Sequence, residues 1–280
     1  MRSMAFINQK GGVGKTTTAV NVAAGLVRLG QRVLLVDLDP QAHASLSMGV
    51  ELSPGDASIY DVLVRGASLY ETVRLVDGRL AVVPSHVDLV AAELELAERS
   101  QRELVLREAL GNLREHYDFV LIDCAPSLGL LSVNALAAVD EVVIPLQPHF
   151  LALQGFGRLM ETVTLVRDNL QPRLRVCGVV LCMHERGTRL GQEVRADVLR
   201  FLEAADPREP WHGARVFDTC IRRNVKLAES PSFGQTIFQY APDSHGAEDY
   251  LALAREILAM RPAAAPRAKP REQQAAAAAK

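Results

Sequence analysis

The chain has 280 residues, of which 49% are hydrophobic, and its net charge is −2. This length and apolar content allow a large core in one α/β domain, and the near-neutral charge excludes a global field that would attract nucleic acid. The sequence runs from its first Met directly into a predicted strand without a signal peptide, and it holds no apolar run of roughly 18 residues that could span a membrane. We therefore expect a cytoplasmic protein.

The first predicted elements are a strand, a glycine-rich turn and a helix. Residues 4–7 are apolar and indicate a short buried strand, and residues 17–29 carry apolar side chains at helical spacing. Glycines between them let backbone N–H groups point at a phosphate, and the helix N-terminus adds partial positive charge. We expect Lys15 to reach the β- and γ-phosphates and the Thr16 hydroxyl to take a place on Mg²⁺.

This turn departs from the strict phosphate-loop pattern, because Gln9 stands at the first glycine position and a second lysine, Lys10, opens the loop. The sequence K-G-G-V-G-K-T-T resembles the deviant Walker A loop of the ParA/MinD group of P-loop ATPases, and the resemblance is closest to the ParA (Soj) branch. It covers residues 1–260 and implies a nucleotide site for ATP with Mg²⁺, made by Lys10, Gly11, Gly12, Val13, Gly14, Lys15, Thr16 and Thr17. It also implies that Lys10 crosses to the phosphates of the other subunit in an ATP-bound homodimer.

The second predicted strand, residues 33–36, is followed by two aspartates. Asp37 and Asp39 are two positions apart, so they project to the same side at the carboxyl end of a parallel strand, where ligands bind. The resemblance implies that Asp39 orients the attacking water and so joins Lys10 and Lys15 in catalysis, and that Asp37 helps to organise the Mg²⁺ surroundings. From the residues alone, either aspartate could instead cap a turn before Pro40.

The next elements predict a second metal-binding position. We expect short helical pieces at 58–63 and 71–73, a strand at 80–83, and helices at 87–97 and 102–117. The apolar strand 119–122 then ends in Asp123, which is the Walker B form, with Asp123 supporting Mg²⁺ directly or through water. Taken alone, Asp123 could be a cap. The resemblance implies that the segment after strand 80–83 helps to build the dimer face.

The remaining chain continues the alternation of strands and helices. This alternation predicts an α/β fold with a doubly wound, mostly parallel sheet and helices on both faces. The expected elements are a helix at 132–139, strands at 141–146, 175–183 and 216–221, and helices at 150–169, 189–202 and 246–260, the last opened by Ser244.

Residues 221–234 read I-R-R-N-V-K-L-A-E-S-P-S-F-G. They resemble the ParA-family segment I-P-R-N-V-[RK]-L-[SA]-E-[AS]-P-S-x-G, in which the arginine falls on Arg223 and Arg222 replaces a proline. The resemblance places the Pro231 loop beside the adenine. Basic residues in this part of the chain are candidates for sequence-independent contacts to the backbone of double-stranded DNA, although each could be a solvated surface charge. They are Arg186, Arg189, Arg222, Arg223 and Lys226.

After residue 260 the composition changes. Residues 261–280 carry 5 Lys/Arg against 1 Asp/Glu, are rich in Ala and Pro, and contain no bulky apolar side chain. We therefore expect an ATPase domain of residues 1–260 followed by a disordered basic tail.

The resemblance implies an ATP-dependent, nucleoid-associated partition ATPase. A ParB-like or cargo-adaptor protein would stimulate hydrolysis, and the cargo stays open. A MinD-like membrane switch is the alternative, but it needs a C-terminal amphipathic helix that the tail does not provide. A metabolic or cluster-assembly enzyme would need cysteine ligands or a second substrate site, and the sequence indicates neither. We expect reduced core thiols without a C-x-x-C pair at Cys124, Cys177, Cys182 and Cys220.

Overall fold

The computed structural model describes residues 1–113, 115–149, 155–185 and 187–260. Its centre is an eight-stranded sheet in the order β3-β4-β2-β5-β1-β6-β7-β8. All neighbouring strands are parallel except the hairpin pair β3 and β4. The strands are β1 (Arg2–Phe6), β2 (Val33–Leu38), β3 (Arg74–Asp77), β4 (Leu80–Val83), β5 (Phe119–Cys124), β6 (Glu141–Leu146), β7 (Arg175–Leu181) and β8 (Arg215–Val216). The predicted α/β class with a doubly wound, mostly parallel sheet is confirmed.

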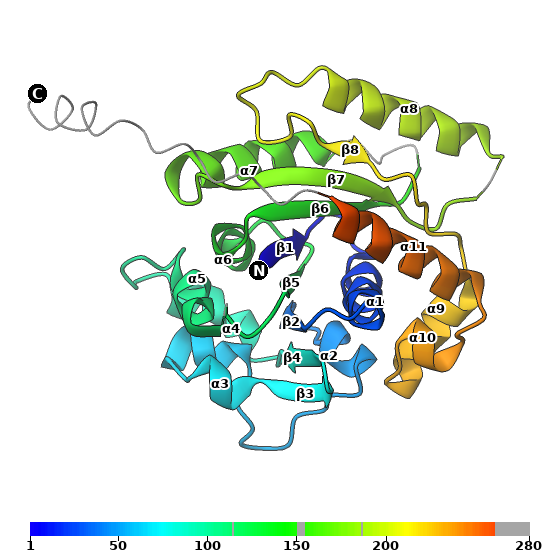
Figure 1. Ribbon diagram of the computed structural model, residues 1–280. Coiled ribbons are helices and arrows are strands. Elements are labelled where there is room, and N and C mark those ends of the chain that lie inside the picture. The colour runs from blue at the N-terminus through cyan, green and yellow to red at the C-terminus, as the bar shows by residue number, and fades with distance from the viewer. Residues whose placement is uncertain (114, 150–154, 186, 261–280) are drawn as a thin grey trace, which may run out of the picture.

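The inner strands are apolar on both faces because helices cover both faces of the sheet. In β1, Met4 and Phe6 contribute to one core and Ala5 to the other, as the alternation of side chains along a strand requires. Helices α1 (Lys15–Arg28), α10 (Ile237–Tyr240) and α11 (His245–Ala259) cover the first face, and Figure 1 shows them to the right of the sheet.

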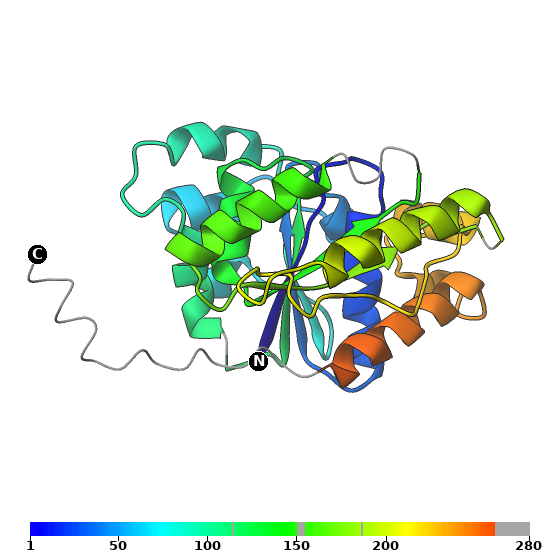
Figure 2. The same ribbon diagram turned by 90° about the horizontal axis from the view of Figure 1, so that it is seen from above.

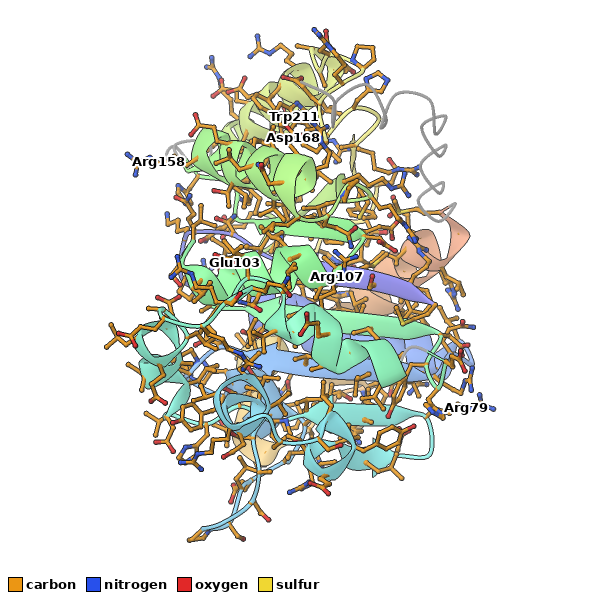
Figure 3. All side chains as sticks on the ribbon, turned by 90° about the vertical axis from the view of Figure 1, so that its left-hand side faces the viewer. Arg79, Glu103, Arg107, Arg158, Asp168 and Trp211 are labelled. Atoms are coloured by element: carbon orange, nitrogen blue, oxygen red, sulfur yellow. The ribbon has the colours of Figure 1, made fainter. Side chains whose placement is uncertain are left out.

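The opposite face is covered by helices from the middle of the chain, so that the sheet lies edge-on between two helical layers in Figure 2. Arg107, labelled in Figure 3, lies on the helix of residues 105–110. It donates at 2.9 Å to the carbonyl oxygen of Leu170, directly after the helix of residues 156–169, and so connects these two helices. The Phe201 ring meets the Phe156 ring edge-to-face and stacks against the ring of Trp211. The other helical elements are α2 (His43–Ser47), η1 (Asp61–Arg65), α3 (Leu69–Thr72), α4 (Leu89–Glu95), α5 (Val105–Leu110), η2 (Gly111–Leu113), α6 (Leu130–Ala138), α7 (Phe156–Asn169), α8 (Arg189–Glu203), α9 (Val225–Glu229) and η3 (Ser230–Phe233).

Several predicted boundaries are wrong. Strand β3 was not predicted, and the helix expected over 102–117 begins only at Val105, after Gln101 adopts a left-handed conformation with φ 56°. The helix expected over 150–169 begins at Phe156 within the described residues, and residues 150–154 lie outside them. The cap at Ser244 is confirmed, because its side chain accepts a hydrogen bond from the N–H of Ala247. Among the described helices, none has the length and apolar character needed to cross a membrane.

Candidate nucleotide-binding site

The loop between β1 and α1 has the backbone of a phosphate cradle. Gly12 and Gly14 have φ angles of 73° and 90°, in the left-handed region that residues with a Cβ rarely adopt. Gly14 is the N-cap of α1 and offers no side-chain cap, so the first N–H groups of this 14-residue helix stay available to an anion. The loop could therefore hold a phosphate, and the nucleotide-binding role of residues 10–17 stays a prediction.

Lys15 lies buried under this loop. Its ammonium group donates to the carbonyl oxygen of Lys10 at 3.1 Å. Burial lowers the pKa of Lys15, while the carboxylates of Asp123 and Asp39 act in the opposite direction. The lysine is thus held at the sheet edge with carboxylates on one side and the glycine loop on the other, which is where a phosphate would meet it.

Asp37 is fully engaged by its own loop. Its Oδ2 accepts hydrogen bonds from the backbone N–H and the hydroxyl of Ser45, both at 2.7 Å, and its Oδ1 accepts from the N–H of Asp39 at 3.2 Å. Burial raises the pKa of Asp37 to about 6, and the bonds from Ser45 work against that increase. In this geometry Asp37 fixes the backbone that carries Asp39 and the start of α2.

Asp123 differs from Asp37 in having no such donors. Both carboxylate oxygens are buried and, among the described residues, neither has a hydrogen-bond partner of acceptable geometry. Burial raises the pKa of Asp123 well above its ordinary value and nearby Asp37 adds to the increase, while the Thr16 hydroxyl and Lys15 act against it. A buried carboxylate without donors is costly unless a cation faces it, so this position fits Mg²⁺.

The described residues contain no cluster of three or more His, Cys, Asp or Glu side chains that could hold a metal by themselves. This is compatible with Mg²⁺, which keeps several waters and is commonly bound by one or two protein groups together with substrate phosphates. Thr16 and Asp123 are the protein groups that approach each other here.

Asp39 follows β2 at the same sheet edge. Its Oδ1 accepts a hydrogen bond from the N–H of Gln41 at 3.0 Å, which fixes the turn after the strand. Asp39 is close enough to Lys15 for its charge to raise the pKa of that lysine. The structure therefore brings Lys15, Asp39 and Asp123 together at the carboxyl ends of β1, β2 and β5.

Lys10 is exposed at the entrance of the loop. Its ammonium group contacts the Nε2 atom of His149, which follows β6, and its backbone N–H donates to Asn8 at 3.0 Å. Burial lowers the pKa of His149, and the charge of Lys10 adds to the decrease. Sequence reasoning missed His149, although a residue just after the parallel strand β6 is expected at this edge of the sheet.

A cavity of about 320 Å³ lies beside the phosphate loop. Its lining is mostly apolar and joins the start of α1 to the segment between β8 and α9. It includes Gly14, Thr17, Met183, Arg222, Asn224 and Tyr250. Pro231 is not among the lining residues; it belongs to η3, which packs against α2. Residues 221–225 line the cavity, so a flat apolar base would fit against them. They belong to the same segment as Pro231, which was predicted to border the adenine.

The predicted DNA-contacting residues separate into two groups. Arg189, Arg223 and Lys226 are exposed, and each forms a surface ion pair, with Glu193, Glu185 and Glu229 respectively. Such pairs are weak and leave the cation available to another anion. Arg222 is different, because its guanidinium group is bound to carboxylates of α11. Arg186 lies outside the described residues.

The four cysteines are free thiols, and three of them are buried. Burial raises the pKa of Cys177 and Cys182 to about 12, so both stay protonated at neutral pH. The expectation of core thiols is therefore confirmed for these two and for Cys124.

Comparison with known proteins decides the family. Residues 1–176 match the family described as AAA domain. The chain is 43% identical to the sporulation initiation inhibitor protein Soj of Bacillus subtilis over 257 residues, which covers 91% of this chain and 98% of that protein. It belongs to the ParA/Soj family of ATPases. Two further relatives in this family are the chromosome-partitioning ATPase Soj of Thermus thermophilus, at 47% identity over 92% of this chain and 96% of that protein, and the chromosome partitioning protein ParA of Caulobacter vibrioides, at 42% identity over 92% and 94%.

Solved structures confirm the fold of this ParA/Soj ATPase. Cobyrinic acid a,c-diamide synthase from Mycobacterium smegmatis, with a bound ATP analog and magnesium, has a TM-score of 0.77 and 32% identity, covering 92% of this chain and 94% of that one. The cell division ATPase MinD of Pyrococcus furiosus has a TM-score of 0.74 and 25% identity, covering 92% and 98%. Because the Soj and ParA relatives are 42–47% identical, the chain is more similar to partition ATPases than to either of these neighbours.

Proposed function

We propose that this protein is a partition ATPase in which ATP binding drives a homodimer onto DNA and hydrolysis releases it. The observation that carries the proposal is the meeting of Lys15, Asp39 and the donor-free Asp123 at one sheet edge, directly under a glycine cradle. A lysine, a carboxylate for a water molecule and a carboxylate for Mg²⁺ are the parts that phosphoryl transfer to water requires.

Each residue has one role in this reaction. The N–H groups of residues 11–17 and the ammonium group of Lys15 bind the phosphates, and Thr16 and Asp123 would hold Mg²⁺. When bound, Mg²⁺ neutralises charge that develops on the phosphate oxygens. Asp39 orients the attacking water. Asp37 holds the backbone of Asp39 in place, because its Oδ1 accepts a hydrogen bond from the N–H of Asp39.

The proposed dimer rests on Lys10 and on an apolar stripe. Val87, Val90 and Leu94, on and just before α4, have exposed fractions of 61%, 64% and 80%. They are spaced so that a helix presents them on one side, and they follow β4, where the family resemblance places the dimer face. Burying them against a second copy would favour association. Lys10, exposed beside this site, would then meet the partner's phosphates.

The proposed DNA face consists of Arg189, Arg223 and Lys226, with Arg186 as a further candidate. We leave out Arg222 because α11 already holds its charge. A dimer doubles the number of cations that face one duplex, so retention on DNA should depend steeply on salt and little on sequence. A ParB-like or cargo-adaptor protein is the expected stimulator of hydrolysis, and DNA binding would place the protein on the nucleoid.

The competing proposal is a MinD-like switch on a membrane surface. Co-sedimentation with ATP and Mg²⁺ separates the two, using plasmid DNA in one arm and vesicles of anionic phospholipid in the other. We expect ATP-dependent co-sedimentation with DNA and none with vesicles. Binding to the vesicles without binding to DNA would overturn the partition function and leave the nucleotide site intact.

A further inference from the structure

We propose that Asp249, on α11, is a positioning residue for the nucleotide. It acts through Arg222, whose loop lines the cavity beside the phosphate loop. The inference deepens the proposed function and rests on it, because it assumes that the base of the nucleotide occupies this cavity.

The contact between the two residues has four polar components. The Nε atom of Arg222 lies 3.0 Å from both carboxylate oxygens of Asp249, Nη2 lies 2.5 Å from Oδ1, and the backbone N–H of Arg222 donates to Oδ2 at 2.9 Å. The side chains are only 21% and 9% exposed. A partly buried pair with this many bonds fixes both the backbone and the side chain of Arg222.

A second carboxylate of α11 holds the same loop at residues 218 and 219, before Arg222 in the chain. Glu256 accepts hydrogen bonds from the N–H groups of Asp218 and Thr219 at 2.9 and 3.1 Å. Positions 249 and 256 are seven apart, so they lie on the same side of the helix. The path from β8 to the cavity is therefore tied to α11 at two places.

Helix α11 also packs on α1, which begins at the phosphate loop. The hydroxyl of Tyr250, next to Asp249, lies 3.2 Å from that of Thr18, and Gly25 of α1 leaves room for Ala254. One rigid helix thus sets the distance between the phosphate cradle and residues 221–224, which together bound the cavity. If Asp249 loses its charge, the guanidinium group of Arg222 loses its main partner and this segment can shift.

The family resemblance does not by itself imply this pair. The family segment quoted above has proline where Arg222 stands, and proline offers neither a guanidinium group nor a backbone N–H to Asp249. The inference therefore rests on the contacts of Arg222 and Asp249 in this chain.

The test compares two ligands, ATP and inorganic triphosphate, which lacks the base and ribose. The variants are Asp249→Asn and Arg222→Gln, and the control is Asp197→Asn, which breaks the exposed Arg200–Asp197 pair on α8. For the first two we expect ATP to bind about tenfold more weakly, the effect of one unsatisfied buried group. Triphosphate binding should stay within about twofold, and KM for ATP should rise while kcat is unchanged. The control should match the unaltered protein for both ligands.

A double variant, Arg222→Leu with Asp249→Leu, keeps the test decisive if a single variant unfolds, because it leaves no buried charge unpaired; Glu248, the other partner of Arg222, is 70% exposed. It should remain folded and bind ATP about tenfold more weakly than the unaltered protein does, while its binding of triphosphate stays within about twofold. Unchanged ATP binding in folded variants, or equal weakening of both ligands, would overturn the inference alone. If the unaltered protein failed to bind ATP, the proposed function would fail as well, so the two failures are distinguishable.

Discussion

Asp37 and Asp123 occupy paired positions on the neighbouring strands β2 and β5, yet within the described part of the chain only Asp37 receives hydrogen bonds of acceptable geometry. Ser45 supplies two donors to Asp37, and the described residues supply none of acceptable geometry to Asp123. The two carboxylates share the same register position on adjacent strands but differ in their hydrogen-bond donors. Asp37 shapes the loop, and Asp123 is left for a cation.

The first prediction concerns this uncompensated carboxylate. Because burial raises the pKa of Asp123, its ionised form destabilises the metal-free protein, and Asp123→Asn should raise the melting temperature by about 3 °C or more. The gain over the unaltered protein should shrink as the pH falls, since an acid with a raised pKa binds its proton more readily in the folded state. Thermal unfolding with EDTA at several pH values measures this.

The same substitution should remove the extra stability that ATP with Mg²⁺ gives over ATP with EDTA, together with Mg²⁺-dependent hydrolysis. A variant that melts lower than the unaltered protein without nucleotide, or that keeps its response to Mg²⁺, would contradict the assignment of Asp123.

The second prediction separates binding from hydrolysis. Asp39→Ala should bind ATP normally, because the phosphate loop and Lys15 are untouched, but hydrolyse it at least about 100-fold more slowly, since the water loses its orienting group. Lys15→Ala is the matched comparison and should abolish ATP binding. Wild-type turnover by Asp39→Ala would remove that residue from the catalytic assignment.

The third prediction concerns the DNA face. Arg223→Glu should keep ATP binding and lose retention on DNA, because two exposed cations per dimer become anions at a phosphate surface. Retention is measured at several salt concentrations. Arg208→Glu, an exposed arginine in the connection before β8 and outside the proposed face, serves as the control. Unchanged retention for Arg223→Glu would move the DNA face elsewhere.

Site residues could be predicted from the sequence when a residue of suitable chemistry directly follows a predicted strand. The glycine loop, Lys15 and Asp123 follow apolar strands, and the carboxyl ends of parallel strands meet at one edge whatever the loops do. The edge strand β3 escaped prediction because its four residues sit between a short helix and a tight hairpin. The function was predicted from the family resemblance. From the residues alone, Asp39 could also have been a cap of the turn before Pro40.

Other features depend on residues far apart in the chain. Arg222 was a DNA candidate by charge, and only the fold shows Asp249, 27 positions later, beside it. The hydrogen bonds from Ser45 to Asp37 depend on α2, which places Ser45 beside the carboxylate. This five-residue helix follows Ala42, which has a left-handed conformation and offers no side-chain cap, so the sequence did not indicate where it begins. His149 beside Lys10 likewise follows from tertiary packing.

The fourth prediction tests the role of Lys10. The carbonyl oxygen of Lys10 accepts from Lys15, but the ammonium group of Lys10 is exposed and contacts His149, which suits a lysine that serves a second copy. Lys10→Ala should therefore retain ATP binding to the monomer through Lys15 and fail to dimerise or hydrolyse. Gln9→Ala, one residue earlier, is the control for disturbance of the loop and should dimerise normally.

The central claim is that ATP joins two copies of this chain. Light scattering of Asp39→Ala, saturated with ATP and Mg²⁺, tests it most directly, because slow hydrolysis preserves the complex. The account predicts twice the 30.5 kDa mass of one chain, and a return to one chain when Lys10→Ala is added. A mass that stays at 30.5 kDa in Asp39→Ala with ATP and Mg²⁺ would contradict it.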